Sequence, residues 1–297
     1  MKCICFGTIL CLCAFAETAN TQVETGTVVV LVTSKDKVAL AADSRATLGN
    51  GGHEDQYCKI LALGNNLIFS ATGIGFLSTP SLPANLRFDT REELRLAYES
   101  PPDPILPESG FTIGVINRWW QRIQYRFMNA VRWLQQNAPG ELAGLRESNM
   151  PQDSFALGIF AGVEPSGDLV TRAPVFKYGK VNRSWLKIDT GPYLTGVAVP
   201  TASDPMQEAA FSYNEVANRY IYGQTPEAQA ERRTWDEIVS KNPQMGIGYV
   251  AIRIVDLDMA FYPPQGSRYI GGKIDAVILK RGGGIEWVQR KENCPAN

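Results

Sequence analysis

The chain has 297 residues, of which 44% are hydrophobic and 20% are charged. These proportions are ordinary for a soluble globular protein and leave enough apolar side chains for a sizeable core. Lys and Arg together count 29, and Asp and Glu count 30. The chain therefore lacks the general excess of positive charge typical of nucleic-acid-binding proteins, and we expect no nucleic-acid partner.

The N-terminal segment differs from the rest of the chain. Lys2 gives it a basic start, residues 3–15 carry no charge, and Ala14-Phe15-Ala16 has the small-x-small pattern of a signal cleavage site. The run is shorter than the roughly 20 residues that a membrane-spanning helix needs. We therefore expect a signal peptide over residues 1–16, export to the periplasm or the cell exterior, and no membrane attachment after its removal. An uncleaved anchor and a strand of a cytoplasmic protein are the alternatives.

The cysteines fall into two groups. Four of them lie inside the expected signal peptide, which leaves Cys58 and Cys294 in the mature chain. In an oxidising compartment these two could form a disulfide, although two unpaired cysteines are an equal alternative. Neither belongs to a CxxC motif, and His53 is the only histidine. The sequence therefore predicts no metal site.

The mature part begins with apolar runs that predict a sheet. Residues 27–33 and 38–42 are rich in β-branched and small apolar residues and flank a polar turn, which predicts a hairpin. Both runs are almost wholly apolar instead of alternating, so we expect both faces of their sheet to be covered. A second pair of strands is expected at residues 59–63 and 67–73.

Helical signals follow these strands. Residues 78–109 are rich in proline and are predicted to contain one short helix, for which Thr90 and Glu93 form a capping box. The clearest helix covers residues 113–136, where apolar side chains recur at three- and four-residue steps. The repeat is typical of a helix that packs on a core.

The second half of the chain mixes both kinds of signal. Strands are expected at residues 155–162, near residue 175, at 185–188, and in a final hairpin of 274–279 with 285–289. Asp204-Pro205 predicts the start of a helix that extends to about residue 222, and another helix should follow Pro226. Residues 245–262 favour a strand by composition and a helix by length.

This order of elements indicates the fold class. Groups of strands and helices alternate along the chain, and no repeat or linker divides it. We predict an α+β fold, a four-layer αββα sandwich with two stacked, mainly antiparallel sheets inside and helices outside. A single domain would cover residues 27–297, with a long helical and proline-rich insert around residues 74–151.

Several catalytic designs do not fit the composition. A serine or cysteine nucleophile activated by histidine would require His53, which lies in a Gly-Gly-His-Glu-Asp stretch typical of an exposed loop. Catalytic metals usually need several converging histidine, cysteine or carboxylate ligands. The glycine clusters at residues 271–272 and 282–284 predict turns, because no GK[ST] sequence follows them.

A threonine at the start of a chain can act as a nucleophile without histidine. Its own α-amine lies about 3 Å from the hydroxyl, titrates near pH 8 and can accept the hydroxyl proton. A lysine kept charged by an aspartate lowers the cost of the alkoxide, and a backbone N–H can hold the oxyanion. Thr27, Asp43, Lys59 and Gly73 supply these groups at the ends of the four expected strands. Thr27 would become N-terminal by cleavage after Gly26.

The same stretch resembles a known family. Gly26-Thr-Val-Val-Val-Leu-Val, followed by Leu40-Ala-Ala-Asp-Ser-Arg-Ala-Thr, is similar to proteasome β-type subunits of the N-terminal-nucleophile hydrolase superfamily. The family places its aspartate sixteen residues after the threonine and its lysine sixteen residues later, as with Asp43 and Lys59 here. The resemblance covers residues 26–73 closely, and weaker similarity returns at 155–162 and 271–278.

The resemblance implies roles for further residues. Gly73 would donate the N–H of the oxyanion hole. Ala46, Tyr57 and Ala71 fall where the family lines the pocket for the residue before the cleaved bond. Because Ala71 is small, we expect this pocket to accept a sizeable apolar side chain.

The chain also departs from the family. Ser267 and Ile270 occupy the places where the family has an aspartate and a serine that support the N-terminal amine. Thr190 and Thr195 are the candidates for the family's mid-chain serine. Residues 74–151 form a longer region than the helices through which the family makes contacts between rings. The sequence therefore does not predict a barrel, and it leaves a homo-oligomer open.

These observations predict an enzyme without a cofactor. Residues 17–26 would be a short propeptide, removed when Thr27 attacks the carbonyl of Gly26. The mature protein would be a threonine-type peptidase or amidohydrolase that cleaves peptide or related amide bonds through an acyl-enzyme on Thr27. The alternatives are a non-catalytic structural or binding protein of the same family and a small-molecule amidase of the superfamily.

Overall fold

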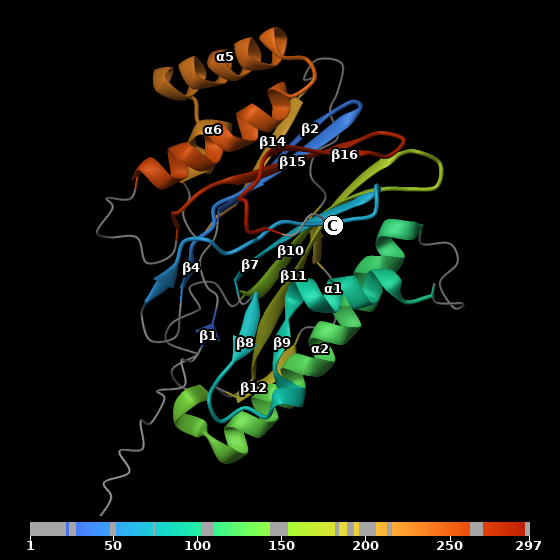
Figure 1. Ribbon diagram of the computed structural model, residues 1–297. Helices are drawn as coiled ribbons and strands as arrows, with labels where there is room; N and C mark the ends of the chain where they lie inside the picture. Colours follow the sequence, from blue (N-terminus) through green and yellow to red (C-terminus); the bar gives the residue numbers. More distant parts are fainter. Residues whose placement is uncertain are drawn as a thin grey trace, which may run out of the picture.

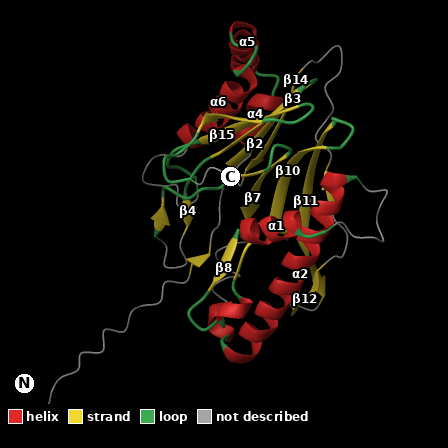
Figure 2. Cartoon of the chain, turned by 45° about the vertical axis from the view of Figure 1, so that its right-hand side comes forward, coloured by secondary structure: helices red, strands yellow, loops and turns green. Residues whose placement is uncertain are grey.

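The computed structural model describes residues 22–23, 28–47, 52–73, 75–101, 110–142, 154–181, 184–188, 193–195, 206–212, 216–261 and 270–294. Over these residues the chain has a mixed α+β fold with two main antiparallel sheets (Figures 1 and 2). The expected signal peptide, together with Gly26, Thr27, Thr190 and Ser267, lies outside the described residues.

The first main sheet contains the two apolar runs of residues 27–33 and 38–42 from residue 28 onward. Its strands follow the order β14-β2-β3-β15-β16, with β2 at Val28–Ser34, β3 at Lys37–Ala42, β14 at Met206–Ser212, β15 at Asp275–Lys280 and β16 at Ile285–Gln289. The hairpins expected at both ends of the chain are thereby confirmed. Ala42 pairs with Val29 on one side and with Asp275 on the other. The end of β3 therefore lies in the middle of the sheet.

The second main sheet follows the order β12-β11-β10-β7-β6, and β13 also pairs with β11. Its strands are β6 at Leu61–Leu63, β7 at Leu67–Gly73, β10 at Ser154–Val163, β11 at Leu169–Val181, β12 at Ser184–Ile188 and β13 at Tyr193–Thr195. The prediction that Lys59 begins a strand is wrong, because β6 starts two residues later. Lys59 instead lies in the segment that leads into it.

Two small sheets lie beside the main ones. In one, β8 at Phe76–Ser78 pairs with β1 at Gln22–Val23 and with β9 at Phe88–Asp89. In the other, β4 at Ala46–Thr47 pairs with β5 at His53–Glu54. The proline-rich region therefore contains a short hairpin and the 3-10 turn η1 at Ala84–Leu86 in addition to its helix.

The helices α1 at Thr90–Glu99 and α2 at Phe111–Asn137 follow this hairpin. The predicted capping box is wrong by one residue, because the N-cap of α1 is Asp89, whose carboxylate accepts from Arg91 N at 2.8 Å. The hydroxyl of Thr90 is buried and donates to Gly75 O at 2.8 Å instead. Helix α2 confirms the prediction for residues 113–136.

The remaining described helices are α4 at Val216–Tyr222, α5 at Pro226–Lys241 and α6 at Gly246–Phe261. The helix predicted from residue 204 is wrong over residues 206–212, which form β14 against β2. Without β14, one edge of the almost wholly apolar β2 would have unpaired backbone groups, and this long-range pairing outweighs the local helix signal. For residues 245–262, the helix indicated by the length of the segment is observed, as α6, and the strand indicated by its composition is not.

Over the part of the chain that the structure describes, three clusters of buried side chains make up the core. One contains residues of both main sheets, including Leu31 and Leu40 from the first and Ile68 and Ile159 from the second. Another joins α1 and α2 to the second sheet and contains a contact of Phe69, Trp119 and Phe160, whose ring centroids lie 4.8–5.5 Å apart. The third joins α4, α5 and α6 to the first sheet. Both faces of β2 are therefore buried, as its apolar sequence predicts.

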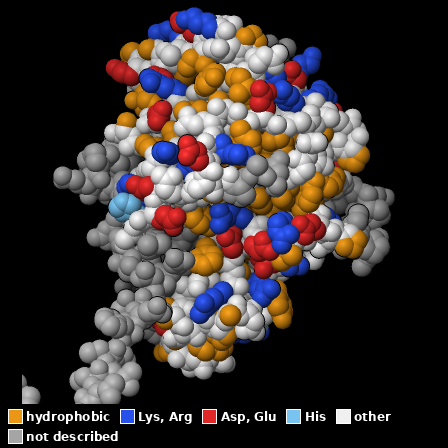
Figure 3. Space-filling view, in the orientation of Figure 1, with side chains coloured by type: hydrophobic (Ala, Val, Ile, Leu, Met, Phe, Trp, Pro, Cys, Tyr) orange, Lys and Arg blue, Asp and Glu red, His pale blue; other side chains and the backbone are white. Residues whose placement is uncertain are grey.

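The surface carries charges of both signs. Figure 3 shows Lys and Arg interspersed with Asp and Glu over the face it presents, in keeping with the near-zero net charge. The single histidine, His53, is exposed, as the loop-like sequence around it predicts. Among the described residues, no helix is both long and apolar enough to cross a membrane.

Candidate functional site

Asp43 directly follows β3 and is completely buried. Its Oδ1 accepts hydrogen bonds from Val28 N at 3.1 Å and from Lys59 Nζ at 3.0 Å. Its Oδ2 accepts from Arg45 N at 3.2 Å and from Gly271 N at 2.9 Å. Burying a carboxylate is costly unless its oxygens are hydrogen-bonded and its charge is paired, and both conditions hold here. The carboxylate is therefore fixed by four donors from separate segments.

Lys59 supplies the positive charge of this pair, and only 1% of its side chain is exposed. It precedes Ile60, which packs in the cluster shared by the two main sheets, and its ammonium is buried against the Asp43 carboxylate. Charges attract more strongly in such surroundings than in water. The Asp43–Lys59 pair is a cation and an anion whose side chains are both buried from solvent.

Val28 connects this pair to the sequence-predicted nucleophile. Val28 N donates to the Asp43 carboxylate, and Asp43 N donates to Val28 O at 3.3 Å. Thr27 and Gly26 are not described, but Thr27 is the residue directly before Val28. The chain is thus held to Asp43 through both backbone groups of the residue that follows Thr27.

Gly73 ends β7 with a φ of 83°, a conformation that glycine adopts far more readily than other residues. It pairs with Ala156 of β10. The described contacts of Gly73 are therefore those of a strand end, and its oxyanion role stays a prediction.

The three residues predicted to line a pocket come from different places. Ala46 is buried in β4, and Tyr57 N donates to Ser44 O at 3.1 Å, so both are attached to the loop after Asp43. The guanidinium of Arg91 lies 4.1 Å from the centroid of the Tyr57 ring. Ala71 is in β7, where it pairs with Gly158. A shared pocket of the three stays a prediction.

The glycine pair at residues 271–272 packs against the loop that follows Asp43. Ser44 N donates to Gly271 O at 3.1 Å, which adds to the bond from Gly271 N to Asp43. Gly272 has a φ of 78°, and a Cβ there would lie 2.4 Å from Ser44 Oγ and 2.8 Å from Asp55 O. Only glycine fits that approach without a shift of the backbone. The sequence predicted a turn here but not its contact with the candidate site.

The residues at the places of the family's amine-supporting pair, Ser267 and Ile270, and the candidates for its mid-chain serine, Thr190 and Thr195, are only partly described. Ile270 is 3% exposed and packs in the apolar cluster beneath α6, where it offers no polar group. Thr195 is in β13, and its side chain lies outside the described residues.

An ion pair missed by the sequence analysis lies beside Asp43. Arg45 Nε and Nη2 donate to Asp55 Oδ1 and Oδ2 at 2.6 and 2.7 Å, which is a bidentate arrangement. The hydrogen bonds from Arg45 are the main reason that the pKa of Asp55 lies below its usual value. The pair braces the loop that carries Ser44. Arg45 was part of the matched string, whereas nothing in the sequence singled out Asp55.

A second buried Lys–Asp pair lies near the first and was also missed. Asp275 pairs with Ala42 in the first main sheet. Its carboxylate accepts a hydrogen bond from Lys291 N at 2.9 Å and forms an ion pair with the Lys291 ammonium. Both side chains are 2% exposed. Burial lowers the pKa of Lys291; the hydrogen bond to Asp275 opposes this, and the charge of Lys59 adds to it. The charge of Asp43 opposes the effect of Lys59 on this pKa, so the two pairs influence one another electrostatically.

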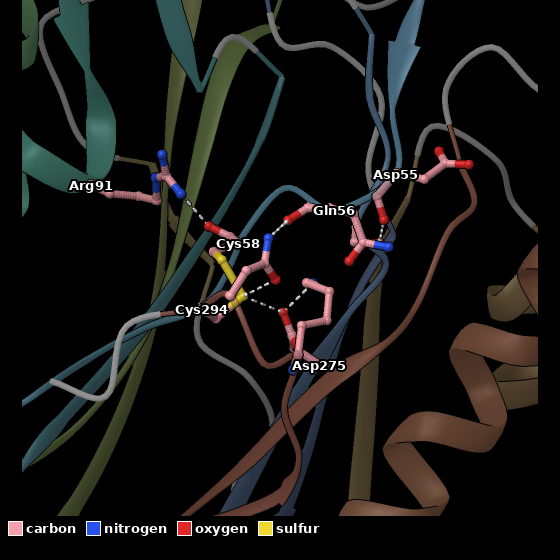
Figure 4. Close-up of a disulfide and its surroundings, with 9 residues drawn as sticks. Asp55, Gln56, Cys58, Arg91, Asp275 and Cys294 are labelled. Carbon is pink, nitrogen blue, oxygen red and sulfur yellow. Dashed lines mark hydrogen bonds and ion pairs between the residues drawn. A yellow bond between two sulfur atoms is a disulfide. The ribbon is translucent and has the colours of Figure 1, made fainter.

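Figure 4 shows the disulfide between Cys58 and Cys294, which settles the alternatives left by the sequence. Arg91 donates to Cys58 O, and Asn293 Nδ2 donates to Gln56 O at 3.1 Å. The Cys294 sulfur lies 3.6 Å from Asp275 Oδ2. These contacts hold the C-terminal turn of residues 291–294 against the segment that leads into Lys59.

Comparisons with known proteins add no family to this description. Neither a scan against models of protein families nor a search of curated proteins gave a match. Within the described part of the chain, His, Cys, Asp and Glu side chains do not gather in threes in a way that could hold a metal ion.

Proposed function

We propose that the protein is a self-processing threonine hydrolase that cleaves peptide or related amide bonds. The observation that carries this proposal is the buried Asp43–Lys59 pair, to which the residue directly after Thr27 is hydrogen-bonded. A buried ion pair is a poor way to gain stability, because desolvation offsets its attraction. A cation fixed beside a nucleophile is useful, however, since it favours the alkoxide.

Self-processing begins when the hydroxyl oxygen of Thr27 adds to the carbonyl carbon of Gly26. The C–N bond between the two residues then breaks, the threonine nitrogen takes up the hydroxyl proton, and an ester links Gly26 to the threonine oxygen. Water hydrolyses this ester and releases the Gly26 carboxylate. The products are the leader ending at Gly26 and a chain that begins with a free threonine amine and hydroxyl.

Cleavage of a substrate repeats this chemistry with the free amine as the base. The Thr27 amine accepts the hydroxyl proton, the oxygen attacks the substrate carbonyl, and the leaving amine takes the proton. Lys59 lowers the cost of negative charge on the threonine oxygen, and Asp43 holds the Lys59 ammonium in place through their ion pair. Gly73 N–H donates to the oxyanion, and Ala46, Tyr57 and Ala71 form the pocket for the residue before the cleaved bond. Water then hydrolyses the acyl-enzyme.

The proposal includes a fold and a location. The fold is a single four-layer αββα domain over residues 27–297, supported by core clusters that join the sheets to one another and each sheet to its own helices. The location is outside the cytoplasm. The Cys58–Cys294 disulfide supports this location, because disulfides persist mainly in oxidising compartments.

The decisive experiment is the intact mass and N-terminal sequence of the purified protein, with Thr27→Ala and Thr27→Ser beside the wild type. We expect the wild type to begin at Thr27, the Ala variant to retain the residues up to Gly26, and the Ser variant to process because it keeps a hydroxyl. If wild type and Thr27→Ala keep the same residues before position 27, the amine stays blocked and the proposed reaction is excluded. If instead the wild type begins at Thr27, a fluorogenic peptide panel follows, and a preference for charged residues before the cleaved bond would reject the apolar pocket.

A further inference from the structure

The leader is bound to the body of the protein as a strand. Gln22 pairs with Ser78 and Val23 with Leu77, so β1 adds to β8 in antiparallel fashion. Figure 1 shows β1 beside β8 and near β4, and β1 also contacts β4. Counted back from Gly26, Val23 is the fourth residue before the proposed cleavage point and Gln22 is the fifth. The structure therefore records how residues at these positions dock.

The strand that receives the leader is firmly built. Leu77 is completely buried in the cluster beneath α1 and α2 and pairs with Phe88 of β9. Just before β8, Gly75 O accepts hydrogen bonds from both the backbone N and the hydroxyl of Thr90, the first residue of α1. β8 is thus fixed by α1 and by β9, and its second edge is the one that β1 occupies.

Cleavage after Gly26 would release this edge. Once the leader leaves, the backbone groups of β8 that faced β1 lose their partners, while β9 still covers the opposite edge. An edge strand with unpaired N–H and C=O groups favours the addition of an extended chain, and main-chain hydrogen bonds make such recognition tolerant of sequence. The leader strand β1, which occupies this edge, also contacts β4, which begins three residues after Asp43.

We propose that the edge of β8 over Phe76–Ser78 is a peptide-binding site, occupied first by the chain's own leader and afterwards by the substrate. It binds the main chain of the fourth and fifth residues before the cleaved bond. The inference rests on the proposed function, because processing vacates the edge. The site predicts that the enzyme prefers extended peptides with at least five residues before the cleaved bond over short peptides and small amides.

Leader variants test the site in the intact chain. In an antiparallel pair, the N–H groups of adjacent residues point to opposite sides. Only one of Gln22 and Val23 therefore donates to β8, and Gln22→Pro and Val23→Pro form a matched pair outside the protein body. We expect one variant to slow the appearance of the Thr27 N-terminus by about five- to tenfold and the other by less than about twofold.

The outcomes separate the two proposals. If the wild type processes and both proline variants process equally fast, the β8 site is overturned while the proposed hydrolase function is retained. If the wild type does not process at all, the proposed function fails and the peptide site fails with it. Slow processing of one proline variant alone supports the site.

A second measurement uses the processed protein and synthetic peptides. Gln-Val-Glu-Thr-Gly and Glu-Thr-Gly, each with the same fluorogenic amide after glycine, differ only in the residues that would reach β8. We expect kcat/KM to be about tenfold higher for the longer peptide, and N-methylation of one of its two added residues to remove the gain. Hydrogen exchange of residues 76–78 gives a readout without turnover. Equal rates for both peptides, or no added protection of these amides by the longer one, would overturn the inference.

Discussion

Cys58 is bonded to Cys294 across 236 residues of sequence, with their Cα atoms 5.5 Å apart. Cys58 directly precedes Lys59, and Cys294 closes the turn that begins with Lys291. The disulfide therefore joins the segment that carries the site lysine to the turn that carries the second buried lysine. Lys59, Asp275 and Lys291 lie within the loop that the disulfide closes, and Asp43 is joined to this loop through its ion pair with Lys59.

Removal of this disulfide should destabilise the protein without unfolding its separate elements. A cross-link over so long a loop restricts the unfolded chain strongly, so we expect the double variant Cys58→Ser/Cys294→Ser to lose about 3–5 kcal/mol of unfolding free energy. Guanidinium unfolding followed by fluorescence measures the change. Wild type in reducing agent is the control and should match the variant, and an unchanged midpoint in both samples would contradict the prediction.

The pair of Lys291 and Asp275 should show the cost of an uncompensated buried charge. Lys291→Met leaves the Asp275 carboxylate buried without its cation, and we expect a loss of about 3 kcal/mol. The double variant Lys291→Met/Asp275→Leu removes both charges and should recover most of that loss, because well-packed apolar side chains replace buried ion pairs at little cost. Denaturant unfolding of the wild type, the two single variants Lys291→Met and Asp275→Leu, and the double variant measures these free energies. Additive losses in the double variant would show that the two side chains are not coupled.

The Arg45–Asp55 pair should make part of the stability depend on acid pH. The pKa of Asp55 is lower in the folded protein than its ordinary value of about 3.9. The folded state therefore binds its proton less readily, so the stabilisation is present above about pH 3.9 and is lost as the pH falls through the folded pKa. Because the side chain is 36% exposed, we expect only about 0.5–1 kcal/mol.

The measurement is the difference in unfolding free energy between wild type and Asp55→Asn at pH 7, 5 and 3. We expect a constant difference at the two higher values and a smaller one at pH 3. Arg45→Met serves as the matched background, because Asp55→Asn should have little effect once its partner is gone. A difference that grows as the pH falls would reverse the predicted sign.

Local sequence patterns were enough to predict much of the fold. The wholly apolar residues of β2 and β3 predict a strand pair buried on both faces, and the spacing of Trp120, Ile123 and Phe127 predicts α2. These signals depend on neighbours in the sequence. Strand β14 was mistaken for a helix because its conformation depends on pairing with β2, which is distant in the sequence.

In the candidate site, too, some residues carry a signal in the local sequence and others do not. Their positions at the ends of expected strands and a family resemblance single out Asp43 and Lys59 in the sequence, and the structure places the Lys59 Nζ 3.0 Å from Asp43 Oδ1. Their catalytic roles stay predictions. Asp275 and Lys291 gave no comparable signal, since a charged residue at a strand end or near a chain terminus is usually solvated. Only the fold brings them into the core beside the first pair.

Substitutions in the first pair should separate catalysis from stability. Lys59→Met removes the cation but leaves Asp43 with backbone donors from Val28, Arg45 and Gly271. If Lys59 favours the Thr27 alkoxide, self-processing of this variant should slow by about 100-fold or more, whereas Lys59→Arg should retain part of the rate because it keeps the charge. Asp43→Asn replaces one carboxylate oxygen, which accepts hydrogen bonds, with an NH₂ group that can only donate and would face other donors. We therefore expect this variant both to stop processing and to destabilise the fold by about 3 kcal/mol. Processing half-times and unfolding curves from the same preparations give both quantities. A folded Lys59→Met protein that processes at the wild-type rate would exclude Lys59 from the reaction and leave the pair a purely structural feature.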